Sequence, residues 1–154
     1  MIVLVVVAVV IFLGGGVVGW AVGSNGHKSA PAAPTPSPWP DNADVSVYLC
    51  SKTASSAKCN GIDATPDQKR QIESELRRMP QIQWVHFLNR QQVYEQARKL
   101  FKNSPSIGEL RYEDFPDAFR VKLKDPKQYR AVVAQIQNRP GVDQVVSRFA
   151  APTP

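Results

Sequence analysis

Apolar residues alternate with polar ones in some segments and recur at helical spacing in others, which predicts a mixture of strands and helices. Residues 44–50 alternate, with one apolar and one polar face, so a half-buried strand is expected there. Residues 82–88 are rich in β-branched and aromatic side chains, which favours a second strand. Between these strands the apolar positions follow the spacing of a helix stripe: Ile72, Leu76 and Met79.

This helix has sequence signals at both ends. Thr65 fits the N-cap, Pro66 the first helical position, and Gln68 the third position of a capping box. Pro80 ends the helix, because proline lacks the N–H that a helix interior needs.

The same pattern returns at an offset of 60 residues, from Ile72 to Val132. Asp125-Pro126 repeats the cap and its proline, residues 118–124 alternate, and Pro140-Gly141 leads into a strand at 142–147. A supersecondary unit built twice predicts an α+β fold, the ferredoxin-like split βαβ–βαβ arrangement with two helices on one face of a four-stranded antiparallel sheet.

The segment 89–116 lies between the two copies and fits neither, so it is expected to form a helical insertion lobe. Asn89 fits an N-cap, with Gln92 in the box position. The apolar stripe could pack on the edge of the sheet. Alternatively, so small a lobe leaves apolar surface exposed for a partner, for example as a groove for a helix. Its apolar residues are Val93, Tyr94, Ala97, Leu100, Phe101, Ile107, Leu110, Tyr112 and Phe115.

Residues 1–23 contain no charged side chain and are long enough, at about 1.5 Å per residue, to cross a bilayer core of about 30 Å. We expect an uncleaved transmembrane anchor, and a cleaved signal peptide is the alternative. Residues 24–43 carry five prolines and are expected to form an extended Pro/Ala/Ser-rich linker. The domain then covers 44–149, and 150–154 form a disordered tail.

The two cysteines, Cys50 and Cys59, bear on which side of the membrane the domain occupies. The first cation after the span, Lys28, favours the cytoplasm on the positive-inside rule. One disulfide between the cysteines is the simplest use of the pair and requires an oxidising compartment. Two free buried thiols are the alternative. We give the cysteines more weight and expect an extracytoplasmic domain.

The formal net charge of +6 lies outside the span. The second sheet face is expected to carry Arg120, Lys122 and Lys124 beside Tyr48 and His86, most simply as a solvated basic face. It lacks the aromatic motif of RNA-recognition domains, so no nucleic-acid partner is expected. The sequence contains no nucleophile–base pair, metal-ligand spacing or phosphate loop. We therefore expect no enzymatic activity, no metal and no cofactor.

Four stretches resemble the extracellular domain of FtsX, the membrane subunit of the FtsEX cell-division complex: Val45-Ser-Val-Tyr-Leu-Cys50, Val85-His-Phe-Leu-Asn-Arg-Gln-Gln92, Phe115-Pro-Asp-Ala-Phe-Arg-Val-Lys-Leu-Lys-Asp-Pro126 and Arg139-Pro-Gly-Val-Asp-Gln-Val145. The cysteine pair looks like that of actinobacterial versions. The resemblance implies a lower helical lobe whose apolar surface binds and activates peptidoglycan hydrolases or their coiled-coil adaptors. That surface maps onto Tyr94, Ala97, Leu100, Phe101, Ile107, Leu110 and Phe115.

The family's FtsX proteins have four transmembrane helices and couple to the ATPase FtsE, whereas this sequence shows one apolar span. We therefore expect a free-standing, single-pass cell-membrane protein without the permease helices and without FtsE coupling. Its C-terminal domain would dock a peptidoglycan hydrolase or another divisome partner. The alternative hypothesis is an envelope sensor or a propeptide-like inhibitor that uses the basic sheet face, and it rests on fold analogy alone.

Overall fold

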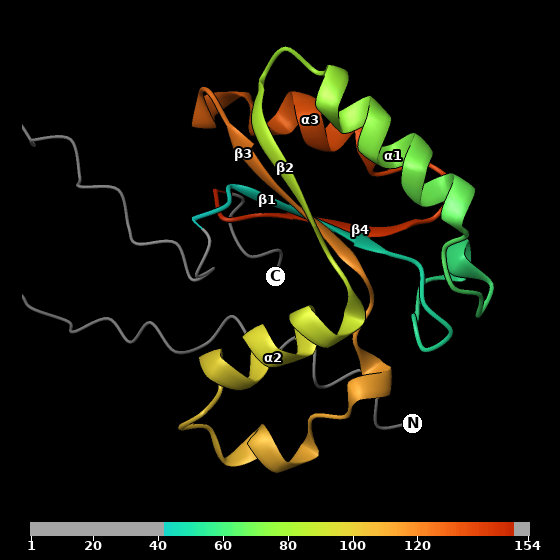
Figure 1. The fold of residues 1–154 in the computed structure, drawn as a ribbon, viewed down its shortest axis with the longest axis vertical. Helices are drawn as coiled ribbons and strands as arrows, with labels where there is room; N and C mark the ends of the chain where they lie inside the picture. The colour runs from blue at the N-terminus through green and yellow to red at the C-terminus, as the bar shows by residue number, and fades with distance from the viewer. Residues whose placement is uncertain (1–41, 150–154) are drawn as a thin grey trace, which may run out of the picture. The chain divides into compact units, whose positions relative to one another are not determined.

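The structure, a computed structural model, describes residues 42–149 (Figure 1). The predicted anchor at 1–23, most of the linker and the tail at 150–154 lie outside these residues. Within the described range, no helix combines the length and the apolarity needed to cross a membrane.

The sheet has the predicted four strands: β1 (Val45–Leu49), β2 (Ile82–Leu88), β3 (Ala118–Leu123) and β4 (Val142–Ser147). All neighbouring pairs are antiparallel, and the spatial order is β2-β3-β1-β4. This is the strand order of the split βαβ–βαβ arrangement, which confirms the fold predicted from the repeat. The two strands of each copy are separated by one strand of the other.

Two helices, α1 (Pro66–Arg78) and α3 (Tyr129–Ile136), cover one face of the sheet (Figure 1). The capping box of α1 forms as predicted between Thr65 and Gln68. The second copy begins differently, because Asp125 accepts a hydrogen bond from the N–H of Lys127, only two residues on. That local bond produces a short 3-10 turn, Pro126–Gln128, before α3 begins at Tyr129.

The insertion lobe consists of α2 (Arg90–Leu100) and two 3-10 turns, η4 (Pro105–Glu109) and η5 (Tyr112–Asp114). Figure 1 shows it below the scaffold, reached from the end of β2 and left at the start of β3. The helical lobe predicted between the two copies is therefore confirmed.

The main core lies between the sheet and the helices α1 and α3. Each strand contributes apolar side chains to it, and the helices contribute the residues predicted from their stripes. Its most buried large side chains are Phe119, Leu49, Leu76, Leu123, Ile136, Val45, Val47, Val121, Val132 and Val142.

The second sheet face is not the open basic surface that the alternation predicted. Arg120 is only 3% exposed, and its guanidinium donates hydrogen bonds to Ser46 Oγ and, at 3.2 Å, to Gln96 Oε1 of α2. Lys122 pairs with Asp44. Strand β1 is accordingly buried on both faces rather than half-buried, since Ser46 is fully enclosed. The alternation pattern could not predict this, because α2 approaches from a distant part of the sequence.

Asp44 is completely buried and fastens both ends of the domain. Its carboxylate lies 3.1 Å from Lys122 Nζ and 2.7 Å from Arg148 Nη2, and it accepts a hydrogen bond from the Leu123 N–H at 2.9 Å. We call Asp44, Lys122 and Arg148 the Asp44 cluster. It connects the residue before β1 to β3 and to the residue after β4.

Cys50 and Cys59 form a disulfide, which confirms that pairing. The bond closes the loop between β1 and α1 across a separation of 9 residues. We name residues 50–64 the disulfide loop. A closed loop of this length restricts the unfolded chain and stabilises the fold by about 2–3 kcal/mol in the chain-entropy model.

A double variant, Cys50→Ala with Cys59→Ala, is therefore expected to lose about 2–3 kcal/mol of unfolding free energy. Urea denaturation of residues 42–149, with and without a thiol reductant, measures the loss. Reductant should destabilise the native sequence and leave the double variant unchanged. Identical midpoints for the oxidised native protein and the variant would contradict the expectation.

Candidate functional site

The entry into the lobe is fixed by hydrogen bonds at the start of α2. Asn89 accepts from the Gln92 N–H, and Gln92 Oε1 accepts from the Asn89 N–H, which completes the predicted capping box. Asp117, which precedes β3, accepts from the Arg90 N–H at 2.7 Å. A carboxylate is favourable at a helix N-terminus, where the backbone N–H groups lack helical partners. The start of α2 is thereby tied to the end of the insertion.

Aromatic rings contact one another across the lobe. The Tyr94 ring stands edge-on to Tyr112, with centroids 6.1 Å apart, and to Phe115 at 5.5 Å. Arg98 lies over Tyr94 and Arg90 lies over Tyr112, each within 6 Å of the ring centroid, a distance at which cation–π attraction operates. Val93 is the buried apolar residue of α2. These contacts join α2 to η5 and give the lobe a small core of its own.

The seven residues predicted for partner binding all lie in the lobe, and none of them is fully buried. Leu100 is 49% exposed. The other six are half-buried: Tyr94, Ala97, Phe101, Ile107, Leu110 and Phe115. Tyr112, at 41% exposure, is the second exposed large apolar residue of the lobe. The predicted surface omitted Tyr112, although it belongs to the same apolar series in the sequence.

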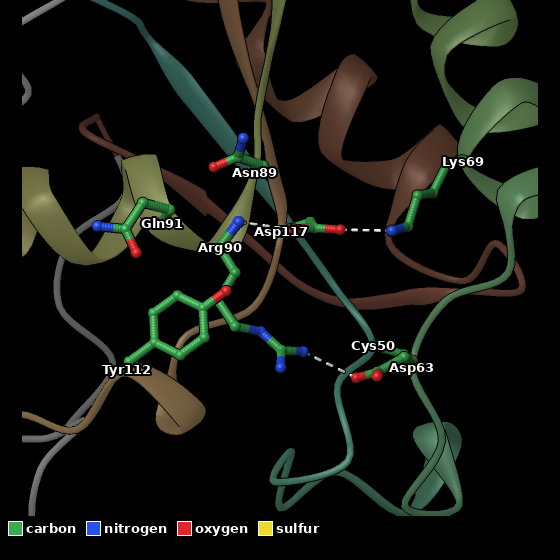
Figure 2. Close-up of a pocket in the computed structure, with 8 residues that line it drawn as sticks. All are labelled: Cys50, Asp63, Lys69, Asn89, Arg90, Gln91, Tyr112 and Asp117. Atoms are coloured by element: carbon green, nitrogen blue, oxygen red, sulfur yellow. Dashed lines mark hydrogen bonds and ion pairs between the residues drawn. The ribbon is translucent and has the colours of Figure 1, made fainter.

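A polar cleft of about 370 Å³ lies where the lobe joins the scaffold (Figure 2). Sequence reasoning missed it, because its residues come from several separate segments and no local motif marks them. Its lining residues are Cys50, Asp63, Lys69, Asn89, Arg90, Gln91, Tyr112 and Asp117.

The charged groups of the cleft are paired with one another. Lys69 of α1 pairs with Asp117, and the Arg90 guanidinium lies 2.9 Å from Asp63 in the disulfide loop. Figure 2 shows both pairs directed across the cleft. Burial opposes ionisation of Asp63, but hydrogen bonds from the Lys52 N–H and from Arg90 outweigh it and lower the pKa of this carboxyl.

These contacts position the lobe. Asp117 links α1 to the first turn of α2, and Asp63 links α2 to the disulfide loop. The loop also reaches η5, where Thr53 Oγ1 donates to the Glu113 carbonyl at 3.0 Å. The lobe is therefore held by polar contacts in addition to its two chain connections, so its orientation on the sheet is defined.

His86, which the sequence places on the second sheet face, stacks on Trp84 with ring centroids 4.6 Å apart. Among residues 42–149, no group of His, Cys, Asp and Glu side chains is arranged to hold a metal ion.

Residues 42–149 match the family model described as the FtsX extracellular domain. The cell division protein FtsX of Mycobacterium tuberculosis (strain H37Rv) is 30% identical over 109 residues. That alignment covers 70% of this chain and 34% of the relative. The same values hold for FtsX of the H37Ra strain. The chain thus spans about a third of the length of the curated relatives that it matches.

The chain is also similar in structure to solved FtsX domains. The solution structure of the large extracellular loop of FtsX from Streptococcus pneumoniae has a TM-score of 0.52 and 18% identity, over 68% of this chain and 98% of that one. The crystal structure of extracellular domain 1 from the same species, in complex with undecyl-maltoside, has a TM-score of 0.49 and 19% identity, over 70% and 95%. The solution structure supports the fold, and the sequence match over residues 42–149 supports the family. This chain therefore belongs to the family of FtsX extracellular domains.

Proposed function

We propose that the domain is a membrane-tethered, extracytoplasmic binding module of cell division that docks a peptidoglycan hydrolase or another divisome partner through its insertion lobe. One observation carries the proposal: Leu100 and Tyr112 are about half exposed on a lobe whose helix is capped and whose rings contact one another. Apolar surface exposed in one patch marks an interaction site, and tyrosine is enriched among the residues that dominate the binding energy of an interface. We assign the contact to the seven predicted residues together with Tyr112.

The sheet offers less support for a competing binding face. The cations on which a sensor or inhibitor would rely are engaged within the domain, since Arg120 bonds to Ser46 and Gln96 and Lys122 pairs with Asp44. Lys124 Nζ donates to the Pro80 carbonyl at 2.8 Å. We therefore favour the lobe over the basic face.

The charged groups of the polar cleft also support a binding domain better than a catalytic one. Its carboxylates are held in ion pairs with Lys69 and Arg90, and Cys50 is locked in the disulfide. These paired groups fix the position of the lobe. An acid–base catalyst would instead need a carboxyl group or a base that is free to exchange a proton. Our proposal for this domain is accordingly a docking role without turnover.

Leu100→Asp is expected to weaken binding of the domain to its hydrolase partner by about tenfold or more, because a charge would replace an interface anchor. Purified peptidoglycan hydrolases of the host, titrated against the domain by calorimetry, supply the measurement. The matched control is Ile62→Asp, which removes an aliphatic side chain that is more exposed, at 61%, from the disulfide loop, outside the lobe.

The control is expected to bind as the native domain does. If Leu100→Asp binds every hydrolase with native affinity, or if Ile62→Asp loses the same affinity, the lobe is not the docking surface.

A further inference from the structure

The chain enters and leaves the domain at one place. Val45, at the start of β1, is paired with Ser147, at the end of β4. Asn42 contacts both partners of Asp44: its carbonyl accepts from Lys122 Nζ at 3.2 Å, and its side chain accepts from Arg148 Nη1 at 3.3 Å. In Figure 1, β1 begins and β4 ends on the same side of the scaffold.

Beside this point, four side chains form a continuous row of contacts. Arg130 lies 5.7 Å from the centroid of the Tyr129 ring, the Tyr129 and Phe149 rings are 5.9 Å apart, and Arg148 lies 4.6 Å from the Phe149 centroid. We call these four residues the Arg–aromatic ladder. The contact between the two rings is explained by a structural role, since it attaches the end of the domain to α3. That role does not explain why the ladder also leaves apolar and charged groups exposed to solvent.

The ladder presents apolar and cationic groups to solvent together. Phe149 is 37% exposed, and Arg130 and the neighbouring Lys127 are exposed as well. Within the part of the chain that the structure describes, neither of these two cations has a carboxylate partner. Of the nearby acids, Asp44 is enclosed by its own cations, and Asp125 contributes one exposed negative charge against the two of Lys127 and Arg130. The face therefore carries an excess of positive charge around an aromatic centre.

We propose that this face, formed by the Arg–aromatic ladder and Lys127, docks on the anionic phospholipid headgroups of a membrane. Aromatic side chains favour the membrane interface, and each cation that reaches an anionic surface strengthens association by about fivefold. The position in the chain favours a lipid occupant. Residues 24–41 separate Asn42 from the uncharged apolar segment 1–23, and Asn42 accepts a hydrogen bond from Arg148 of the ladder. The face therefore adjoins the point at which the proposed tether enters the domain. The inference rests on that tether.

Such docking has a consequence for the lobe. In the pairing of β1 with β3, Val45 lies opposite Val121 and Tyr48 opposite Ala118. The lobe therefore joins the sheet at the end opposite to the chain entry. If the ladder contacts the membrane, the end of the sheet that carries the lobe would point away from the bilayer.

The full chain in lipid nanodiscs tests the proposal by hydrogen–deuterium exchange. Discs of phosphatidylcholine are compared with discs of equimolar phosphatidylcholine and phosphatidylglycerol. Amides of residues 127–131 and 147–149 are expected to exchange more slowly in the anionic discs, by up to about fivefold, because the ladder is covered there. The variant Lys127→Glu with Arg130→Glu should abolish this difference, and unchanged exchange in β1 and β3 shows that the variant is folded.

The matched control, Lys52→Glu with Lys58→Glu, changes the net charge equally but lies in the disulfide loop, and it should keep the protection. Equal exchange in the two kinds of disc, or loss of protection in the control, would overturn the proposal. The same protection from polyphosphate added to neutral discs would assign the face to a soluble polyanion and also overturn it. If the chain does not remain with the discs, the proposed membrane tether is wrong. The same exchange measurement, made with added neutral and anionic vesicles, still tests whether the face docks on anionic lipid.

Discussion

Replacing Phe119 with alanine is expected to lower the unfolding free energy of residues 42–149 by about 3–5 kcal/mol. Phe119 is 1% exposed and belongs to the central strand β3, where it lies opposite Val47 on one neighbour and Phe87 on the other. Removing the ring leaves a cavity that β3 cannot close by shifting, because backbone hydrogen bonds hold this strand to a neighbour on each side. Urea denaturation followed by circular dichroism measures the loss.

The matched control is Phe87→Ala. The two rings touch, with centroids 5.3 Å apart, but Phe87 lies on the edge strand β2 and is 40% exposed. We expect it to cost about 1 kcal/mol, since the ring is already partly in water and solvent can enter the space that it leaves. Similar losses for the two variants would show that the core is not centred on β3.

Asp44→Ala is expected to cost about 3 kcal/mol, although the substitution adds no bulk and removes no apolar contact. It would leave Lys122 and Arg148 next to each other without their shared anion, and the Leu123 N–H without its acceptor. Uncompensated charge and an unmade hydrogen bond in a buried place are both costly. The midpoint of urea denaturation at neutral pH gives the measurement.

Asp67→Ala is the control for this prediction. Asp67 also pairs with an arginine, Arg70, but both side chains are mostly exposed, so the pair contributes at most about 0.5 kcal/mol. Asp44→Asn should fall between the two, because the amide can still accept from the Leu123 N–H. If Asp44→Ala is as stable as Asp67→Ala, the Asp44 cluster does not fasten the ends of the domain.

The parts of the fold that the sequence predicted correctly are those with local causes. Thr65 with Gln68, and Asn89 with Gln92, identify helix starts through bonds between residues three apart, and both capping boxes form. The strand order followed from the repeat, because few topologies place two βαβ units in one sheet. Asp125 resembled Thr65 as a cap, but it accepts from the N–H two residues on, whereas Thr65 accepts from the N–H three residues on. The start of α3 was therefore predicted too early.

The errors and omissions have non-local causes. Arg120 was predicted to be exposed because its strand alternates, and it is buried because Gln96, from the insertion, reaches it. The polar cleft depends on Asp63 meeting Arg90 and on Lys69 meeting Asp117, contacts between segments far apart in the sequence. No spacing rule predicts such pairs, because they are set by how the lobe sits on the scaffold.

The pairing of β1 with β4 also determines how the domain would respond to a pulling force. Both chain ends are attached to the same end of this strand pair, where Val45 lies opposite Ser147. Ends pulled apart would therefore open β1 from β4 one hydrogen bond at a time, beginning with the bond from the Arg148 N–H to the Asp44 carbonyl. A load applied to both ends in the same direction would not stretch the sheet. The strand pair is thus the mechanical weak point of the domain, and the Asp44 cluster reinforces the end from which it would open.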